Sequence, residues 1–309
     1  MKKTAVVYAG QGAQAVGMGK DLVAAHPECK DLFDRASAVL EFDLARLCAE
    51  GPIEEITRSD NCQPAIFVTS AACFAALRKL HPGLQVSGFA GLSLGEWTAL
   101  YAGGVLSFED AVKVLKVRGK AMQEACEERQ GGMVSVMGLA LAELEKVCAA
   151  AGVQMANINS PEQIVLSGEK AKIAEAEKRA QAAGAKKTVV LPVAGAFHSP
   201  LMASAAAKLE QVLKGVTVRA PAVPVVSNVT GKPHGTPEEI KALMVRQLTS
   251  SVQWVGSIEW FKQNGVTEYV ECGPGKVLSG LIKRIDKDAA ALNIGDVPTL
   301  DKAVAALKV

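Results

Sequence analysis

The sequence predicts an α/β protein, with a mostly parallel sheet covered by helices and a smaller α+β unit inserted into it. Short apolar runs of strand character alternate with longer segments of helical spacing, which is typical of a parallel sheet with helices on both faces. Over about residues 131–193 the pattern changes, and strand-like runs come close together. The 309 residues are 49% hydrophobic and 21% charged, which allows a large core and excludes a disordered chain.

The larger unit begins with an apolar run, Thr4–Ala9, that ends in a glycine-rich turn and is predicted to be a buried strand. A second strand, Val86–Ala90, leads through a turn into a helix that runs to Gly103-Gly104. The remaining elements are predicted from helical spacing, caps and apolar runs. They are the helices Leu22–Leu47, Gln63–Leu80, Ser107–Glu127, Pro237–Gln247 and Trp254–Asn264, a closing helix after Gly275, and the strands Val223–Asn228 and Glu268–Cys272.

The inserted unit has the order strand-helix-strand-strand-helix-strand, which is that of a ferredoxin-like domain. We therefore expect a ferredoxin-like subdomain over residues 130–194 and a parent α/β core over 1–129 and 195–309. Its predicted strands are Met133–Met137, Val153–Ile158, Gln163–Ser167 and Thr188–Val193, and its predicted helices are Ala140–Ala151 and Glu169–Ala183.

Composition excludes several classes of function. A net charge of +2 argues against nucleic acid as the main partner, because phosphate binding needs a concentrated basic surface. The chain has no run of about 18 apolar residues, so no membrane span is predicted. The first apolar run is broken at Gly10, too early for a signal peptide. The seven cysteines form no Cys-x-x-Cys pair, so we expect buried free thiols and a cytoplasmic protein.

The segment Gly91-Leu92-Ser93-Leu94-Gly95 lies between a predicted strand and a predicted helix. A serine between two glycines in this setting matches a nucleophile elbow, in which the serine has a strained backbone and the glycines let strand and helix approach closely. The first amides of the helix, Leu94 above all, would point at the Ser93 oxygen and stabilise an oxyanion. The alternative is an ordinary strand-to-helix turn with a capping serine.

A serine nucleophile needs a base, and the chain has four histidines. His26 and His81 precede prolines at apparent helix ends, where a turn or cap role is expected, and His234 is predicted to lie in a surface loop rich in glycine and proline. Elimination leaves His198, at the junction where the inserted unit rejoins the core and where clefts form. The alternative is that His198 is a core histidine whose hydrogen bonds are satisfied. No acidic residue stands out as the third member of a catalytic triad.

Arg118 lies on the apolar stripe of the helix Ser107–Glu127, together with Ala111, Leu115 and Met122. A buried cation needs a partner, because an unpaired buried charge costs several kcal/mol. An internal salt bridge, a stem that snorkels to the surface, and a clamp for a substrate carboxylate are all compatible with this position.

The turn Gly10-Gln11-Gly12-Ala13-Gln14 follows the first strand and resembles a phosphate-binding loop, but neither nucleotide-binding motif fits its spacing. We therefore expect this turn to supply a second donor to the oxyanion.

Together these motifs resemble malonyl-CoA:acyl-carrier-protein transacylases and the related acyltransferase domains of polyketide and fatty acid synthases. The resemblance extends over nearly the whole chain and implies a hydrolase-like core with a ferredoxin-like subdomain and the active site between them. It is carried by Gly10–Gln14, Gly91–Glu96, Val117–Met122, Asn157–Gly168, Phe197–Met202, Gln247–Trp254 and Glu271–Leu281.

The resemblance implies a catalytic role for three residues and an oxyanion hole made by two backbone amides. Ser93 would be the acylated nucleophile and His198 its base, and the backbone carbonyl of Gln247 would orient the histidine. The amides of Gln11 and Leu94 would form the oxyanion hole.

The resemblance also implies a substrate-binding set. Arg118 would bind the malonyl carboxylate, and Phe197 would favour malonyl over branched acyl groups because its ring crowds the α-carbon. Met122 and Asn159 would complete the set.

The implied function is transfer of a malonyl group from malonyl-CoA to the phosphopantetheine thiol of acyl carrier protein, which supplies fatty acid biosynthesis. We expect no metal, no cofactor and a monomer. The alternatives are an acyltransferase that serves a polyketide or polyunsaturated fatty acid synthase, an acyl-thioester hydrolase, and a binding protein without turnover.

Two positions depart from the family pattern. Leu92 stands where the family usually has histidine, and Ser251 where it commonly has proline, which predicts an altered hydrogen bond near the serine and a more flexible loop after Gln247.

The sequence does not locate the surface on which the carrier protein docks. An acidic carrier protein would dock on a basic surface. The candidates for it are Lys186, Lys187, Lys276, Lys283 and Arg284.

Overall fold

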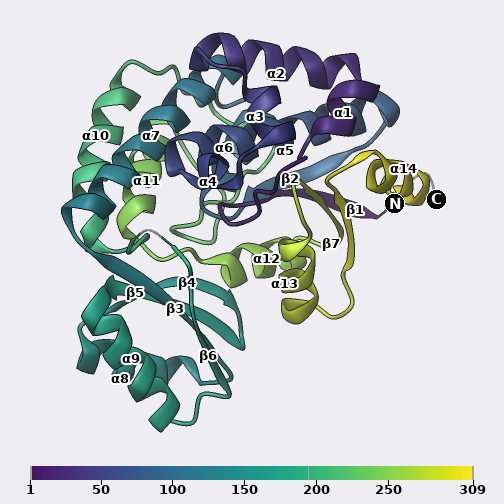
Figure 1. The fold of residues 1–309 in the computed structure, drawn as a ribbon. Coiled ribbons are helices and arrows are strands. Elements are labelled where there is room, and N and C mark those ends of the chain that lie inside the picture. The colour runs from purple at the N-terminus through teal and green to yellow at the C-terminus, as the bar shows by residue number, and fades with distance from the viewer. Residues whose placement is uncertain (1, 194, 308–309) are drawn as a thin grey trace.

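The computed structural model describes residues 2–193 and 195–307, which form two four-stranded sheets flanked by helices (Figure 1). The first sheet is parallel, with the strand order β2-β1-β7-β8. Its strands are β1 (Lys3–Tyr8), β2 (Val86–Gly91), β7 (Val266–Cys272) and β8 (Ala290–Ile294). The expected α/β class with a mostly parallel sheet is confirmed.

Twelve α-helices of the described residues and two 3₁₀ turns belong to this part of the molecule. Side chains cap two of them: Ser107, at the predicted start of its helix, accepts from the Asp110 amide (3.1 Å), and Thr236 forms a capping box with Glu239. They are α1 (Lys20–Ala25), α2 (Pro27–Leu40), α3 (Leu44–Glu50), α4 (Ile53–Thr57), α5 (Ser59–Leu80), α6 (Leu94–Ala102), α7 (Phe108–Glu128), η1 (Pro200–Met202), α10 (Ala203–Lys214), α11 (Pro237–Arg246), η2 (Gln247–Thr249), α12 (Trp254–Gln263), α13 (Val277–Ile285) and α14 (Val297–Leu307).

The parallel sheet is apolar because helices cover both of its faces. Side chains of β1 alternate between the two faces: Val6 and Tyr8 pack in one cluster with residues of α2, α5 and α7, whereas Ala5 and Val7 pack in another with residues of α12 and α13. In Figure 1 these two groups of helices lie on opposite sides of the sheet.

The second sheet is antiparallel, with the order β4-β5-β3-β6. Its strands are β3 (Gly131–Met137), β4 (Gln154–Ser160), β5 (Gln163–Glu169) and β6 (Lys187–Val190), and its helices are α8 (Leu141–Ala151) and α9 (Lys170–Ala182). This is the ferredoxin-like arrangement that the order of elements predicted. Figure 1 shows α8 and α9 on the face of this sheet that points away from the rest of the molecule. Residue 194, the predicted last residue of the subdomain, lies outside the described residues, and the boundaries remain a prediction.

The two sheets are joined by contacts of β4 with α12 and α13. Asn157 of β4 forms an isolated parallel bridge with Val252, and the Ser251 hydroxyl donates to the Met155 carbonyl. These bonds tie the loop that follows Gln247 to the second sheet.

Several sequence predictions were wrong or incomplete. The single helix predicted over Leu22–Leu47 is three helices, because His26-Pro27 ends α1 and Glu41 ends α2 in a left-handed conformation (φ 67°). The predicted strand Val223–Asn228 makes only isolated bridges, from Val225 to Phe89 and from Val226 to Pro233. The elements α10, β8 and α14 were not predicted.

No helix in the described ranges is both long and apolar enough to cross a membrane. All seven cysteines are buried free thiols, as their spacing predicted.

Candidate active site

Ser93 lies on the turn between β2 and α6, in a backbone conformation (φ 52°, ψ −103°) that residues with a side chain rarely adopt. The turn is tight because a side chain on Gly91 would overlap the backbone of Gly95, and one on Gly95 would overlap the carbonyl of Tyr8. The glycines therefore allow α6 to approach the sheet, and the turn has the geometry of a nucleophile elbow.

The Asn228 side chain braces this elbow. The Ser93 amide donates to Asn228 Oδ1 (2.6 Å), and Asn228 Nδ2 donates to the Gly91 carbonyl (2.7 Å). One buried side chain thus fixes the backbone that leads into the strained serine. Asn228 is not among the predicted site residues, and it comes from a segment 135 residues further along the chain.

His198 is placed as a base for Ser93. Its Nε2 lies 2.8 Å from Ser93 Oγ, and its Nδ1 lies 2.8 Å from the backbone carbonyl of Gln247. Burial, opposed by the hydrogen bond to the Gln247 carbonyl and reinforced by the charge of Arg118, lowers the pKa of His198 to about 4. The ring is therefore neutral near pH 7, with Nδ1–H donating to the carbonyl and Nε2 free to accept the serine proton.

Arg118 is 1% exposed and points at the nucleophile from α7. Its Nη1 donates to Gln63 Oε1 (2.7 Å), and its Nη2 donates to Gln247 Oε1 (2.9 Å) and lies 3.4 Å from Ser93 Oγ. Burial lowers the pKa of Arg118 to about 10, and Glu96 opposes this shift, so the side chain stays charged near pH 7.

Within the described residues, no carboxylate lies within 4.0 Å of the Arg118 guanidinium, and its buried Nε has no hydrogen-bond partner. For Arg118, the sequence left three alternatives open. The geometry excludes a side chain that snorkels to the surface, and it excludes a direct salt bridge to any of the described residues. It leaves a buried cation that can accept an anionic ligand next to Ser93.

A cavity of about 270 Å³ opens over Ser93 and His198, between the two sheets. Four more of the predicted site residues line it: Gln11, Met122, Asn159 and Phe197. Asn159 Oδ1 is buried and has no partner in the described part of the chain, so it is available to a ligand. The complete lining is Gly10, Gln11, Gly12, Gln14, Thr57, Ser59, Leu92, Ser93, Met122, Met133, Asn157, Asn159, Val165, Leu191, Pro192, Val193, Phe197 and His198.

The two amides predicted for the oxyanion hole come from neighbouring turns. β1 and β2 pair in parallel with Tyr8 opposite Gly91, which brings the turn that carries Gln11 beside the elbow. Leu94 is the first residue of α6. Leu92, between them, lines the cavity and packs partly buried against the core, so it adds an apolar wall where a histidine would add a polar one.

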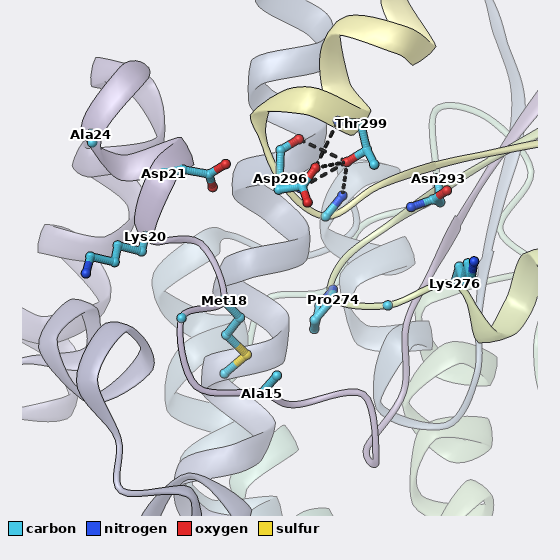
Figure 2. Close-up of a pocket in the computed structure, with 13 residues that line it drawn as sticks. Ala15, Met18, Lys20, Asp21, Ala24, Pro274, Lys276, Asn293, Asp296 and Thr299 are labelled. Carbon is cyan, nitrogen blue, oxygen red and sulfur yellow. Dashed lines mark hydrogen bonds between the residues drawn. The ribbon is translucent and has the colours of Figure 1, made fainter.

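A larger cavity, of about 700 Å³, lies at the ends of β7 and β8 (Figure 2). Three of the residues that line it bond to one another: the Thr299 amide donates to Asp296 (2.8 Å), and the Gly295 amide donates to Thr299 Oγ1 (3.0 Å). Figure 2 also shows Lys20 pointing away from the cavity. The smaller cavity is therefore the candidate active site, because it alone of the two is lined by the serine and the histidine. Arg118 lies buried next to that serine.

The model of the acyl transferase domain family matches residues 5–293 of the chain. This chain belongs to the acyl transferase family.

Curated relatives of this acyl transferase include the malonyl CoA-acyl carrier protein transacylases of Escherichia coli O157:H7 and Bacillus subtilis. The first is 43% identical over 95% of this chain and 96% of the relative, and the second is 40% identical over 100% and 98%. Among solved structures, the malonyl CoA-acyl carrier protein transacylase of Coxiella burnetii matches with a TM-score of 0.96 at 36% identity, covering 100% of this chain and 98% of that one. A holo complex of a type II polyketide synthase acyl-carrier protein with its malonyl-transacylase matches with a TM-score of 0.95 at 38% identity, covering 98% and 99%. The suspected family is confirmed.

The structure brings all of the predicted site residues to one region, but the roles of these residues stay predictions. The predicted position of one histidine was wrong. His234 does not lie in a surface loop: it is buried, and its Nε2 lies 2.7 Å from Glu96 Oε1. Glu96 and Gln63 are also absent from the predicted site residues. A signal for Glu96 was present, since a lone acid in the otherwise apolar helix Leu94–Ala102 needs a buried partner.

Proposed function

We propose that this chain transfers a malonyl group from malonyl-CoA to the phosphopantetheine thiol of acyl carrier protein through an acyl-Ser93 intermediate. The observation that carries this proposal is the Arg118 guanidinium, buried without a carboxylate partner among the described residues and 3.4 Å from Ser93 Oγ. An acyl group that ends in a carboxylate satisfies this cation, whereas acetyl leaves it unpaired.

In the first half-reaction His198 Nε2 takes the proton of Ser93 Oγ as the oxygen attacks the thioester carbonyl. The amides of Gln11 and Leu94 stabilise the oxyanion, and the Gln247 carbonyl stabilises the charged imidazole through Nδ1–H. The C–S bond then breaks, His198 returns the proton to the sulfur, and coenzyme A leaves.

In the second half-reaction His198 takes the proton of the phosphopantetheine thiol, and the sulfur attacks the ester carbonyl of malonyl-Ser93. Collapse of the second tetrahedral intermediate breaks the C–Oγ bond, and His198 gives the proton back to the serine. Because the two thiols use the same site in turn, the kinetics should be ping-pong.

The relatives favour two biological settings for this chemistry. The Escherichia coli and Bacillus subtilis relatives, named for malonyl transfer to acyl carrier protein, support supply of fatty acid biosynthesis. The match to a polyketide malonyl-transacylase at 38% identity supports a discrete transferase of a type II polyketide synthase as the second candidate. In either setting we propose a cytoplasmic monomer that needs no metal or cofactor.

Intact-mass analysis after incubation with malonyl-CoA tests the proposal. The wild type should gain the mass of one malonyl group and lose it when acyl carrier protein is added, and Ser93→Ala should show no adduct. An adduct on Ser93→Ala would refute the nucleophile. Release of the malonyl group to water at the same rate with and without carrier protein would refute the transferase.

A further inference from the structure

Two buried titratable side chains lie behind the nucleophile, and the mechanism above does not use them. Glu96 is fully buried on α6, three residues after Ser93. His234 comes from the loop before α11, and its Nε2 lies 2.7 Å from Glu96 Oε1 with both side chains almost completely buried. Because burying ionisable groups costs free energy, such a pair next to an active site indicates a specific role.

The second oxygen of Glu96 binds the side chain of Gln247. Gln247 Nε2 donates to Glu96 Oε2 (2.6 Å) and to the Ser93 carbonyl (2.9 Å), which uses both of its hydrogens. Gln247 Oε1 is then left to accept from Arg118 Nη2 (2.9 Å).

A carboxylate can only accept hydrogen bonds, and this decides which way the Gln247 amide points. With an ionised Glu96, the NH₂ group must face the carboxylate, so the carbonyl oxygen faces the guanidinium. The opposite orientation would set Oε1 against a carboxylate and NH₂ against a cation, leaving several buried groups unsatisfied.

His234 keeps Glu96 in this role. Its buried Nδ1 has no partner within the described ranges. With Nε2–H donating to Glu96, Nδ1 of a neutral ring carries only a lone pair, which costs less to bury without a partner than an N–H would. Glu96 in turn raises the pKa of Arg118, against the effect of burial.

We propose that Glu96, held by His234, is a positioning residue that sets the Gln247 side-chain amide with its oxygen toward Arg118 and thereby places the guanidinium for a substrate carboxylate. This inference rests on the proposed malonyl transfer. It concerns which acyl group is selected, because the bond from His198 to Gln247 is made by the backbone carbonyl and not by the side chain.

The test compares kcat/KM for Ser93 acylation by malonyl-CoA and by acetyl-CoA. Glu96→Gln puts a second amide opposite Gln247, which can then turn its NH₂ group toward Arg118. We expect malonyl kcat/KM to fall by about ten- to hundredfold, mostly through KM, and acetyl kcat/KM by less than about threefold. Glu268→Gln is the matched control: it also neutralises a buried carboxylate, one that binds Thr4 away from the site (3.0 Å), and should leave the malonyl-to-acetyl ratio unchanged.

Two variants of His234 test the same pair without changing the charge of residue 96. His234→Leu removes the donor and should lower the malonyl-to-acetyl ratio in the same direction as Glu96→Gln, whereas His234→Gln, which can place an N–H near the former Nε2, should restore it. If Glu96→Gln does not fold, the two His234 variants provide the test of the positioning role.

A malonyl-to-acetyl ratio within twofold of the wild type in both Glu96→Gln and His234→Leu would overturn the positioning role, as would an equal loss with both substrates. These outcomes, with a wild type that transfers malonyl to carrier protein, leave the proposed function intact. A wild type that forms no malonyl adduct would overturn the proposed function, and the positioning role with it.

Discussion

Replacing Arg118 by alanine separates the recognition of the acyl group from the chemistry at Ser93. Arg118 Nη2 lies 3.4 Å from Ser93 Oγ, so a carboxylate three carbons from the thioester sulfur can reach the guanidinium while the carbonyl carbon meets the serine. Each hydrogen bond to a charged group contributes about 1.5–3 kcal/mol. Loss of a two-bond contact therefore costs at least about 3 kcal/mol, which corresponds to a decrease of roughly 100-fold or more in kcat/KM for malonyl-CoA.

Acetyl transfer should decrease much less in Arg118→Ala, by under about tenfold, because acetyl has no group for the guanidinium. The substitution also leaves the side-chain oxygens of Gln63 and Gln247 without their donor, at about 1–3 kcal/mol each, so urea unfolding must show that the variant is folded. Arg118→Lys is the matched variant, since it keeps the charge but loses the planar two-bond contact and should lie between the wild type and Arg118→Ala.

The assay is the initial rate of carrier-protein acylation, measured by mass spectrometry for each acyl-CoA. Equal losses of malonyl and acetyl transfer in folded Arg118→Ala would refute the clamp, because they would place Arg118 in the common chemistry. An Arg118→Lys variant as impaired as Arg118→Ala would instead show that the charge alone contributes nothing measurable.

Three further predictions follow from the geometry. Because burial lowers the pKa of His198 to about 4, Ser93 acylation should persist well below pH 6 and be lost as the pH falls through about 4, and an acid limb near pH 6.5 in kcat/KM would contradict this. The unfolded chain binds that proton already near pH 6.5, so the contribution of His198 to stability is present above pH 6.5 and decreases as the pH falls from 6.5 to 4, which urea unfolding at several pH values measures. Asn228→Ala should destabilise the fold by about 1–3 kcal/mol and slow acylation, since the Ser93 amide and the Gly91 carbonyl lose their partner, and an unchanged rate would show that the elbow holds without it. Gly95→Ala should prevent folding or abolish acylation because the new methyl group meets the end of β1, while Gly280→Ala, on an open helix position, should leave both unchanged or add about 0.5–1 kcal/mol of stability by circular dichroism melting.

The parts of the fold that sequence predicted well are those that local chemistry specifies. The cap of α7, the alternation of strands with helices and the order of elements in the second sheet are all short-range signals. The division of residues 20–50 into three helices was missed because one apolar period continues through both breaks. The segment Val223–Asn228 has the composition of a strand, but it pairs with its neighbours only at isolated bridges, which are set by the surrounding packing.

The sequence by itself determined the elbow, the choice of His198 and the position of Arg118 on a buried helix face. These follow from local requirements: close approach of strand and helix needs glycine, and an arginine on an apolar stripe needs a partner. Only the tertiary structure decided which groups hold these residues in place. Gln247, Asn228 and His234 reach Ser93 and Glu96 from segments more than 130 residues away. No spacing rule predicts such contacts, because a hydrogen bond between distant segments depends on where packing brings their backbones, and a buried polar group shows its partner only when the chain is folded.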